Sequence, residues 1–288
     1  MKRRFIVLGV LFMIFGLTGV NAQILSDKAM GALGKGVSGF TFSDADAAAL
    51  AKKAIEEMDA NNPVAGPTDG YAIRLNRVFG KHATSEGVTL NYKVYLVKDI
   101  NAFACADGSV RVFAGLMDIM DDNELLAVIG HEIGHVVNHD TRDAIKAAYK
   151  KEALMDAASS QSGKVEAITN SQLGAIGSAM IDSKHSRKQE SEADLYSYNF
   201  MKKNGYDVNA VESAFRILQK LSEGADSSFM TKMMSSHPDS GKRAEEAKKR
   251  ATKDGLYKAY EQQKIVNTAP ATKTTKTTPA KKTTAKKK

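Results

Sequence analysis

Two histidines four residues apart, His131 and His135, lie within a long apolar stretch of the sequence. Residues at this spacing share one face of a helix, so both imidazoles can reach a single metal ion. Glu132 follows the first histidine, where its carboxylate can reach a metal-bound water, and this arrangement is typical of zinc hydrolases. A helix with two surface histidines and an exposed glutamate would share the pattern by chance, so the pattern needs support from the rest of the chain.

The residues around this motif indicate a buried helix. They are mostly apolar and include Val128, Ile129, Ile133, Val136 and Val137. Buried imidazoles and carboxylates require partners, which a metal site would supply. Gly130 and Gly134 each cost about 1 kcal/mol relative to alanine in a helix. We therefore expect another backbone to approach the helix closely at these two glycines.

A catalytic zinc needs a third protein ligand and an open position for water. His139 continues the four-residue spacing, but its Cα would lie about 12 Å along the helix from that of His131, so we expect it outside the site. Glu190 and Asp194 share one face of a later helix, whereas Glu192 points away from that face. One of the two carboxylates can bind the metal while the other accepts the second N–H of a ligand histidine. An ordinary charged helix face would also contain this pair.

The N-terminus carries the pattern of an export signal. Residues 2–4 are basic, and residues 5–17 form an apolar run of 13 residues. Residues 20–22 offer a small-residue cleavage site, so residues 1–22 are predicted to be a signal peptide. An uncleaved membrane anchor is the alternative, but the run is shorter than the roughly 17–25 residues of a spanning helix. Because Val20 stands where a lipoprotein signal requires cysteine, we expect an exported protein, periplasmic or secreted, that is not a lipoprotein.

The C-terminus is of low complexity. Residues 265–288 contain seven lysines, no acid and no apolar side chain larger than alanine after Val266, which predicts a disordered Lys/Thr/Pro/Ala tail. This tail is either a solvated spacer or a salt-sensitive contact with anionic envelope surfaces. The net charge of +8 arises at the two ends, because residues 23–264 hold 31 basic and 33 acidic residues. That balance argues against nucleic acid as a partner.

Between the ends, the sequence predicts a mainly helical chain with one small sheet. Ser43 and Asp46 form a variant of the capping box that begins a helix. Residues 90–97 are rich in strand-forming side chains. Asp107 and Gly108 separate two further short strands, and this dipeptide favours a two-residue hairpin turn in which both residues have positive φ.

Two features have no chemical role in this interpretation. Residues 140–183 suggest two helices, which either cover the site as a lid or fill space. Cys105, the only cysteine, cannot form a disulfide within the chain and is expected to be a small buried apolar residue.

Several motifs together resemble a known family of proteases. They are Asn91-Tyr92-Lys93-Val94-Tyr95, Asn101-Ala102-Phe103-Ala104, residues 111–117, His131 to His135, residues 186–194 and His237-Pro238. Their order and spacing, over about residues 40–250, resemble the zinc metallopeptidase family of HtpX, the Oma-type proteases and the CAAX prenyl proteases. The similarity is strongest to the exported, LoiP-like branch of low-osmolarity-induced proteases.

This resemblance implies a fold and a set of ligands. The fold is an α+β, mainly helical, zincin-like (gluzincin) metallopeptidase domain with a small antiparallel sheet. It would span residues 43–264, after an N-terminal segment at residues 23–42. One Zn²⁺ per chain would be bound by His131, His135 and Glu190. Glu132 would be the general base, and Asp194 would hydrogen-bond to a ligand histidine.

The resemblance also implies residues that meet the substrate. The sheet edge beside the zinc would pair with an extended polypeptide through Asn101, Ala102, Phe103 and Ala104, unless this is a structural hairpin with a covered edge. His237 would lie near the metal, either as a donor to the oxyanion or as a brake in the open position of the zinc. If Pro238 simply begins a helix, His237 only flanks that helix.

The sequence therefore predicts a zinc metalloendopeptidase of protein quality control. Its substrates would be unfolded or damaged envelope proteins, and a metal-activated water would attack the peptide bond with Glu132 as base. The alternative is a zinc-bound, chaperone-like or scaffold protein of the envelope without turnover, which would have no need of Glu132. The oligomeric state is not specified by the sequence.

Overall fold

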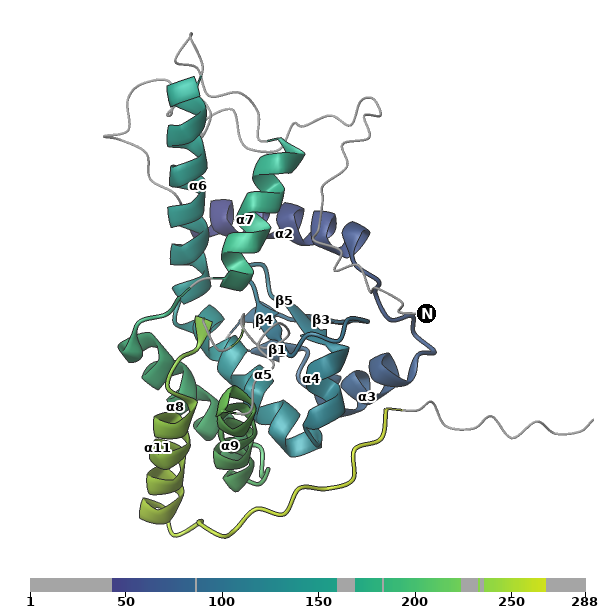
Figure 1. The fold of residues 1–288 in the computed structure, drawn as a ribbon, viewed down its shortest axis with the longest axis vertical. Coiled ribbons are helices and arrows are strands. Elements are labelled where there is room, and N and C mark those ends of the chain that lie inside the picture. The colour runs from purple at the N-terminus through teal and green to yellow at the C-terminus, as the bar shows by residue number, and fades with distance from the viewer. Residues whose placement is uncertain are drawn as a thin grey trace, which may run out of the picture.

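A small sheet lies between two groups of helices in the computed structural model (Figure 1), which describes residues 43–85, 87–159, 169–182, 184–223, 233 and 236–267. The upper group comprises α2 (Asp44–Asn61), α6 (Asp140–Ser159) and α7 (Asn170–Asp182). The lower group comprises α5 (Asp122–Val137), α8 (Arg187–Lys203), α9 (Asn209–Glu223) and α11 (Ser240–Lys253). The predicted signal peptide, residues 23–42 and residues 268–288 of the tail lie outside the described residues.

The main sheet has three strands in the order β3-β5-β4. They are β3 (Asn91–Tyr95), β4 (Ala102–Ala104) and β5 (Ser109–Phe113), and a separate antiparallel ribbon joins β1 (Thr84–Ser85) to β2 (Val88–Thr89). The predicted mainly helical α+β fold with a small sheet is confirmed. Antiparallel pairing holds between β4 and β5, whereas β3 runs parallel to β5. Because β5 inserts between the other two strands, the connection from β3 to β5 passes through the edge strand β4.

The β4–β5 hairpin is present, but its predicted two-residue turn is wrong. The N–H of Cys105 donates to the carbonyl of Ser109 at 2.8 Å, which leaves a three-residue loop. Gly108 has a φ of 84°, whereas Asp107 is not among the residues with positive φ. The Asp107 carboxylate instead accepts from the N–H of Ser109 at 3.0 Å and from its hydroxyl at 2.7 Å. These side-chain hydrogen bonds stabilise the longer loop.

The helices begin where local sequence signals place them. Reciprocal capping boxes are formed by Ser43 with Asp46 at the start of α2 and by Asp121 with Glu124 at the start of α5. The predicted pair of helices in residues 140–183 is also confirmed, as α6 and α7. No helix in the described part of the chain is long and apolar enough to cross a membrane.

Both faces of β5 are buried. Val110 and Val112 belong to the core that includes α5, whereas Phe113 packs in a second core with α2, α6 and α7. Arg111 lies on the same face as Phe113 and is 2% exposed. Its guanidinium donates from Nε and Nη2 to the two carboxylate oxygens of Asp59 on α2, at 2.8 and 2.9 Å. This charge pair ties α2 to the centre of the sheet.

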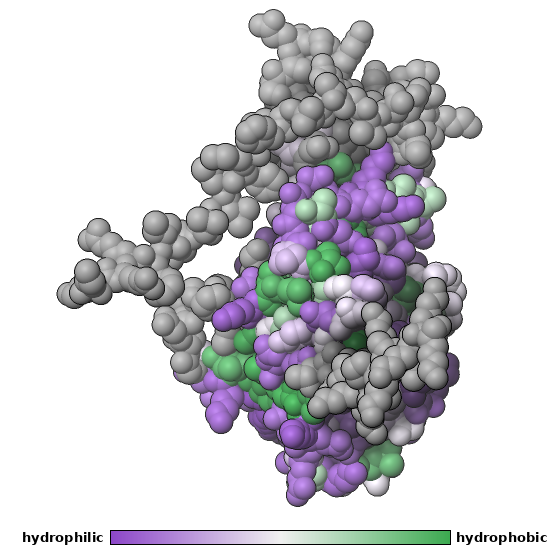
Figure 2. Space-filling view, turned by 90° about the vertical axis from the view of Figure 1, so that its right-hand side faces the viewer, coloured by the Kyte–Doolittle hydropathy of each residue, from purple (hydrophilic) through white to green (hydrophobic). Residues whose placement is uncertain are grey.

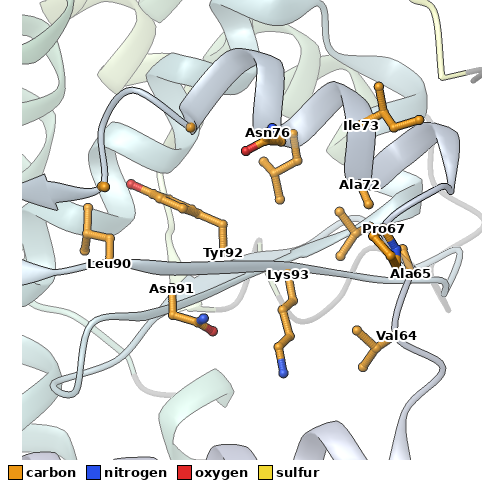
Figure 3. A pocket seen from close by; sticks show the side chains of 14 residues that line it. Val64, Ala65, Pro67, Ala72, Ile73, Asn76, Leu90, Asn91, Tyr92 and Lys93 are labelled. Carbon is orange, nitrogen blue, oxygen red and sulfur yellow. The ribbon is translucent and has the colours of Figure 1, made fainter. Parts of the chain in front are cut away.

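The outer edge of β3 lines a cavity of about 610 Å³ that lies against α3 (Gly70–Phe79) (Figure 3). Its walls are mainly apolar and include Val64, Ala65 and Ile73. Figure 2 shows the face of the molecule on the side of α3 and β3, where apolar residues gather among hydrophilic ones. None of the predicted site residues lines this cavity, which lies at the sheet edge opposite β4.

The chain after α11 crosses the base of the molecule as an extended strap, residues 254–267 (Figure 1). The hydroxyl of Tyr260 donates to Asp121 at 2.7 Å, and the amide of Gln262 donates to Glu124 at 2.6 Å. Asn267 accepts from Arg74 at 2.8 Å, near α4 (Ala114–Ile119). The strap therefore holds the cap of α5 from outside.

The charge pair between α2 and β5 yields a test of stability. Asp59→Ala should lower the free energy of unfolding by about 3–5 kcal/mol, because it leaves the buried Arg111 guanidinium unpaired. Glu246→Ala is a matched control at an exposed carboxylate that pairs with Lys249, and it should change the free energy by less than about 0.5 kcal/mol. Urea unfolding of both variants would measure the difference, and equal values would contradict this role of Asp59.

The same pair predicts a pH dependence. Burial alone would raise the pKa of Asp59, but the hydrogen bonds from Arg111, Lys93 and Tyr95 outweigh it and lower that pKa to about 2. A lowered pKa means that the stabilisation is present above the unfolded-state pKa of about 3.9 and is lost as the pH falls towards 2. The gap in stability between wild type and Asp59→Ala should therefore narrow across that range in urea titrations. A constant gap would contradict the prediction.

Candidate metal centre

Helices α5 and α8 pack against each other at unusually short range. A Cβ atom on Gly134 would lie 2.9 Å from the Cα of Ala193, whereas one on Gly130 would lie 3.3 Å from Cδ1 of Phe200 and 3.5 Å from the Cα of Ser197. The expected close approach of another backbone is therefore confirmed at Gly134, whereas Gly130 makes tight contact with a side chain. This packing brings the imidazoles of His131 and His135 close to the carboxylates of Glu190 and Asp194 on α8.

Four side chains converge there. His131, His135, Glu190 and His237 each offer a ligand atom, these atoms lie within 4.8 Å of one another, and all four residues are buried. The Nε2 atoms of His131 and His135 are 3.1 Å apart. The Nδ1 of His237 lies 2.9 Å from Glu190 Oε1 and 3.3 Å from His131 Nε2. The structure thus brings together the three predicted ligands and the predicted loop histidine.

The other nitrogen of each helix histidine is held by a carboxylate. Asp194 Oδ1 lies 2.9 Å from His131 Nδ1, and Asp140 Oδ2 lies 2.8 Å from His135 Nδ1. A carboxylate only accepts hydrogen bonds, so each Nδ1 carries a hydrogen and each Nε2 presents a lone pair. The two Nε2 atoms are 3.1 Å apart, so their lone pairs can be shared by one metal ion. Imidazole nitrogens and a carboxylate oxygen are the donors that zinc prefers, so the residues fit a metal ion.

Glu132 has no structural partner for one of its oxygens. The side chain is buried, and its Oε1 accepts no hydrogen bond from the described residues. Nε2 of His237 lies 3.6 Å from this oxygen. Burial raises the pKa of Glu132, although the charges of His237 and His135 oppose that rise. The carboxyl group is therefore free to exchange a proton.

Arg243 of α11 joins the two carboxylates of α8. Its Nη2 donates to Asp194 at 2.6 Å, its Nη1 lies 2.8 Å from Glu190 Oε2, and its guanidinium lies 4.1 Å from the ring centre of Phe215. Burial alone would raise the pKa of Asp194, but Arg243 and His131 outweigh it and hold that pKa below its usual range. Burial would also raise the pKa of Glu190, but hydrogen bonds with His135 and His237 and the charge of Arg243 outweigh it and lower that pKa, which favours the ionised form of both carboxyl groups.

The surroundings shift the pKa values of the two helix histidines in opposite directions. Burial and the nearby Arg243 lower the pKa of His131 to about 3, so its imidazole is neutral. Burial would also lower the pKa of His135, but the hydrogen bonds to Asp140 and Glu190 outweigh it and raise that pKa to about 9. A hydrogen on Nε2 of His135 would have to leave before that atom could bind a metal ion.

Asp140 and His185 were not identified from the sequence. Asp140 is an acid five residues after His135, just past the end of α5, and that position was its only local signal. His185 lies with its ring centre 3.8 Å from that of His135, at an interplanar angle of 15°. Burial and the charges of His135 and His237 lower the pKa of His185 to about 3. His185 precedes α8 and is far from His135 in the sequence, so only the tertiary fold brings it to the site.

The predicted substrate edge lies near the site but outside the ligand cluster. β4 is an edge strand that packs against α5. All four residues of the predicted edge are buried: the exposed fraction is 3% for Asn101, which precedes β4, and 2%, 4% and 5% for Ala102, Phe103 and Ala104 of β4. The amide nitrogen of Asn101 has no hydrogen-bond partner among the described residues. Binding of substrate along this edge stays a prediction.

Three residues are excluded from the cluster, as expected from the sequence. His139 is exposed, with a φ of 66°, just beyond the end of α5. The side chain of Glu192 is 48% exposed. Cys105 is 1% exposed, and burial raises the pKa of its thiol, so it is a buried apolar residue and not a nucleophile.

Comparison with known proteins gives consistent matches. Residues 72–251 match the family model described as peptidase family M48. The metalloprotease LoiP of Escherichia coli is 39% identical over 218 residues, which are 75% of this chain and 85% of that protein. The metalloprotease YcaL of E. coli is 41% identical over 211 residues, or 73% and 82% of the two chains. The protease HtpX of Xanthomonas euvesicatoria is 33% identical over 132 residues, or 44% of each chain.

The geometry distinguishes the neighbouring acids of α8. Glu190→Ala should abolish stoichiometric zinc binding, because it removes one of the converging ligand atoms. Glu192→Ala is the matched control, since its carboxylate points to solvent, and it should retain the metal. Atomic absorption of the purified, dialysed proteins would measure the zinc content. Equal loss in both variants would exclude Glu190 as a specific ligand.

Proposed function

This chain belongs to peptidase family M48 and is a metalloendopeptidase, and we propose that its metal is a single zinc ion and that it cleaves unfolded or damaged envelope proteins. One observation carries the choice of zinc hydrolysis over zinc binding alone. Glu132 is buried beside the four converging ligand atoms, with an oxygen that serves no structural hydrogen bond among the described residues. Burial of an unpaired carboxyl group is costly, and a catalytic base accounts for it.

The residues of the chain divide the work of peptide hydrolysis. When bound, zinc supplies a Lewis acid that polarises the scissile carbonyl and makes water more acidic. His131, His135 and Glu190 would hold it, with the two histidines fixed by Asp194 and Asp140. Glu132 accepts the proton of the attacking water at its free Oε1. It then delivers this proton to the leaving amine nitrogen as the C–N bond breaks, so no covalent intermediate is needed.

The raised pKa of Glu132 suits this role. A carboxylate with an ordinary pKa is a weak base at neutral pH, whereas burial brings the pKa closer to the working pH. His237 also faces Glu132, since its Nε2 lies 3.6 Å from Oε1. Between attack of the water and release of the amine, the proton on Glu132 is therefore surrounded by buried side chains.

His237 is assigned the role of a brake in this arrangement. Its Nδ1 lies 2.9 Å from Glu190 Oε1, inside the group of ligand atoms. An imidazole in that place would take the coordination position that water needs. The alternative role, donation to the oxyanion, requires the ring to swing away from Glu190 while staying at the site.

The proposed substrates are extended polypeptides. Main-chain pairing along a sheet edge tolerates many sequences, which suits a protease of unfolded proteins, and β4 is the edge strand next to α5. We also propose export to the periplasm or the exterior, supported by the signal pattern of residues 1–22, and contact of the lysine-rich tail with anionic envelope surfaces. An envelope scaffold that binds zinc without turnover is the second candidate.

Glu132→Gln tests the role of the base. The variant should degrade casein about 10²–10⁴-fold more slowly than wild type, because an amide cannot accept the proton, while its zinc content is unchanged. Glu192→Gln makes the same chemical change at an exposed position and should be as active as wild type. If pure wild-type protein binds zinc yet degrades no unfolded substrate, the scaffold interpretation replaces the enzymatic one.

His237→Ala separates the two roles of the loop histidine. A brake predicts activity on casein equal to or higher than that of wild type, with zinc retained by the three remaining ligands. An oxyanion donor predicts a decrease in kcat of about 10²–10³-fold with zinc retained. Steady-state kinetics with parallel metal analysis would distinguish these outcomes. A variant that matches wild type in kcat, KM and zinc affinity would leave His237 only a structural role.

A further inference from the structure

Helices α6 and α7 form an arm that begins and ends at the metal centre. Asp140 is the first residue of α6, and His185 lies three residues after the end of α7. His185 in turn directly precedes Ser186, the cap of α8. Both ends of the arm touch the same imidazole, that of His135.

At its beginning, the arm holds the edge of that ring. Asp140 Oδ2 accepts the hydrogen of His135 Nδ1 at 2.8 Å. The other oxygen, Oδ1, accepts from the amide of Gln189 at 2.7 Å. Gln189 belongs to the capping box of α8, so Asp140 is fixed between α8 and the ring. This contact sets which nitrogen of His135 carries the hydrogen.

At its end, the arm covers the face of the ring. The ring centre of His185 lies 3.8 Å from that of His135, and the two planes differ by 15°. The same ring lies 5.4 Å from His237. Asp140 at the edge and His185 on the face together oppose rotation of the His135 side chain about its two side-chain torsions. Such a rotation would turn Nε2 away from the other ligand atoms.

The rest of the arm packs elsewhere. Ile145 of α6 and Ile176 of α7 are buried, and they belong to the core that contains Leu50 of α2 and Phe103 of β4. Figure 1 shows the arm on the side of α2, whereas α8, α9 and α11 lie on the other side of the sheet. The position of the arm is therefore set by a core that contains none of the metal ligands.

We propose that the α6–α7 arm controls the metal affinity of the centre, with Asp140 and His185 as positioning residues that hold His135 from two sides. The proposal rests on metal binding at His135, which is part of the proposed function. Because coupling between two sites is reciprocal, metal binding must also hold the arm in place. Displacement of the arm releases His135 and weakens metal binding.

Hydrogen exchange of the full chain with and without Zn²⁺ tests this coupling directly. Zinc should slow exchange in peptides from residues 140–151 and 170–182, beyond the slowing in α5 and α8. His185→Ala and Asp140→Asn should reduce that protection and weaken zinc binding by about 10–100-fold, measured by competition with a chelator. His185→Phe keeps a stacked ring and should bind zinc close to wild type. His139→Ala, at an exposed histidine, is the matched control and should change neither readout.

A variant remote from the metal separates coupling from local damage. Ile176→Ala loosens the packing of the arm without touching any ligand, so it should speed exchange in α6 and α7 and also weaken zinc binding. Faster exchange of the arm with unchanged zinc affinity would overturn the proposal. Equal exchange of the arm in wild type with and without bound zinc would also overturn it. Failure of wild type to bind zinc would instead overturn the proposed function on which the inference rests.

Discussion

At Gly134, helix α5 comes so close to α8 that a side chain there would meet the backbone of Ala193, with a Cβ only 2.9 Å from its Cα. Glu190 and Asp194 have short side chains. Their carboxylates reach the imidazoles of α5 only because the two helix axes are close. The cost of glycine inside a helix, about 1 kcal/mol at each position, is thus tied to the site and not to the fold alone. Any side chain at this position would separate the two halves of the ligand set.

The second constraint is the balance of charge in the core. Glu132, Asp140, Glu190 and Asp194 are buried, and Arg243 is the cation that pairs directly with two of them. Four buried carboxyl groups around one guanidinium need further positive charge. A divalent ion, the proton of His135 and protonation of Glu132 are the means that the residues offer. The positive charges that stabilise these buried carboxyl groups are therefore the same ones that the chemistry of the site uses.

The parts of the site that could be predicted depend on helical periodicity. His131 and His135, and likewise Glu190 and Asp194, share a face because they are four residues apart, and the capping residues mark where their helices begin. Asp140 and His185 could not be predicted in the same way, because their roles depend on where an intervening arm of the chain returns. The prediction of a two-residue hairpin turn is wrong for a local reason. Hydrogen bonds from Ser109 to the Asp107 carboxylate favour a longer loop than the dipeptide Asp107-Gly108 alone suggests.

The position of the arm in the sequence explains why it carries positioning residues. The chain must leave the metal helix after His135 and return to it before Glu190, so whatever it inserts between them starts and finishes at the metal centre. Side chains at the two junctions are held near the ligands by the backbone itself, at little cost in chain entropy. Asp140 and His185 occupy these two junctions. The rest of the arm is free to pack on α2 and the sheet, and through its two ends that packing bears on a single imidazole.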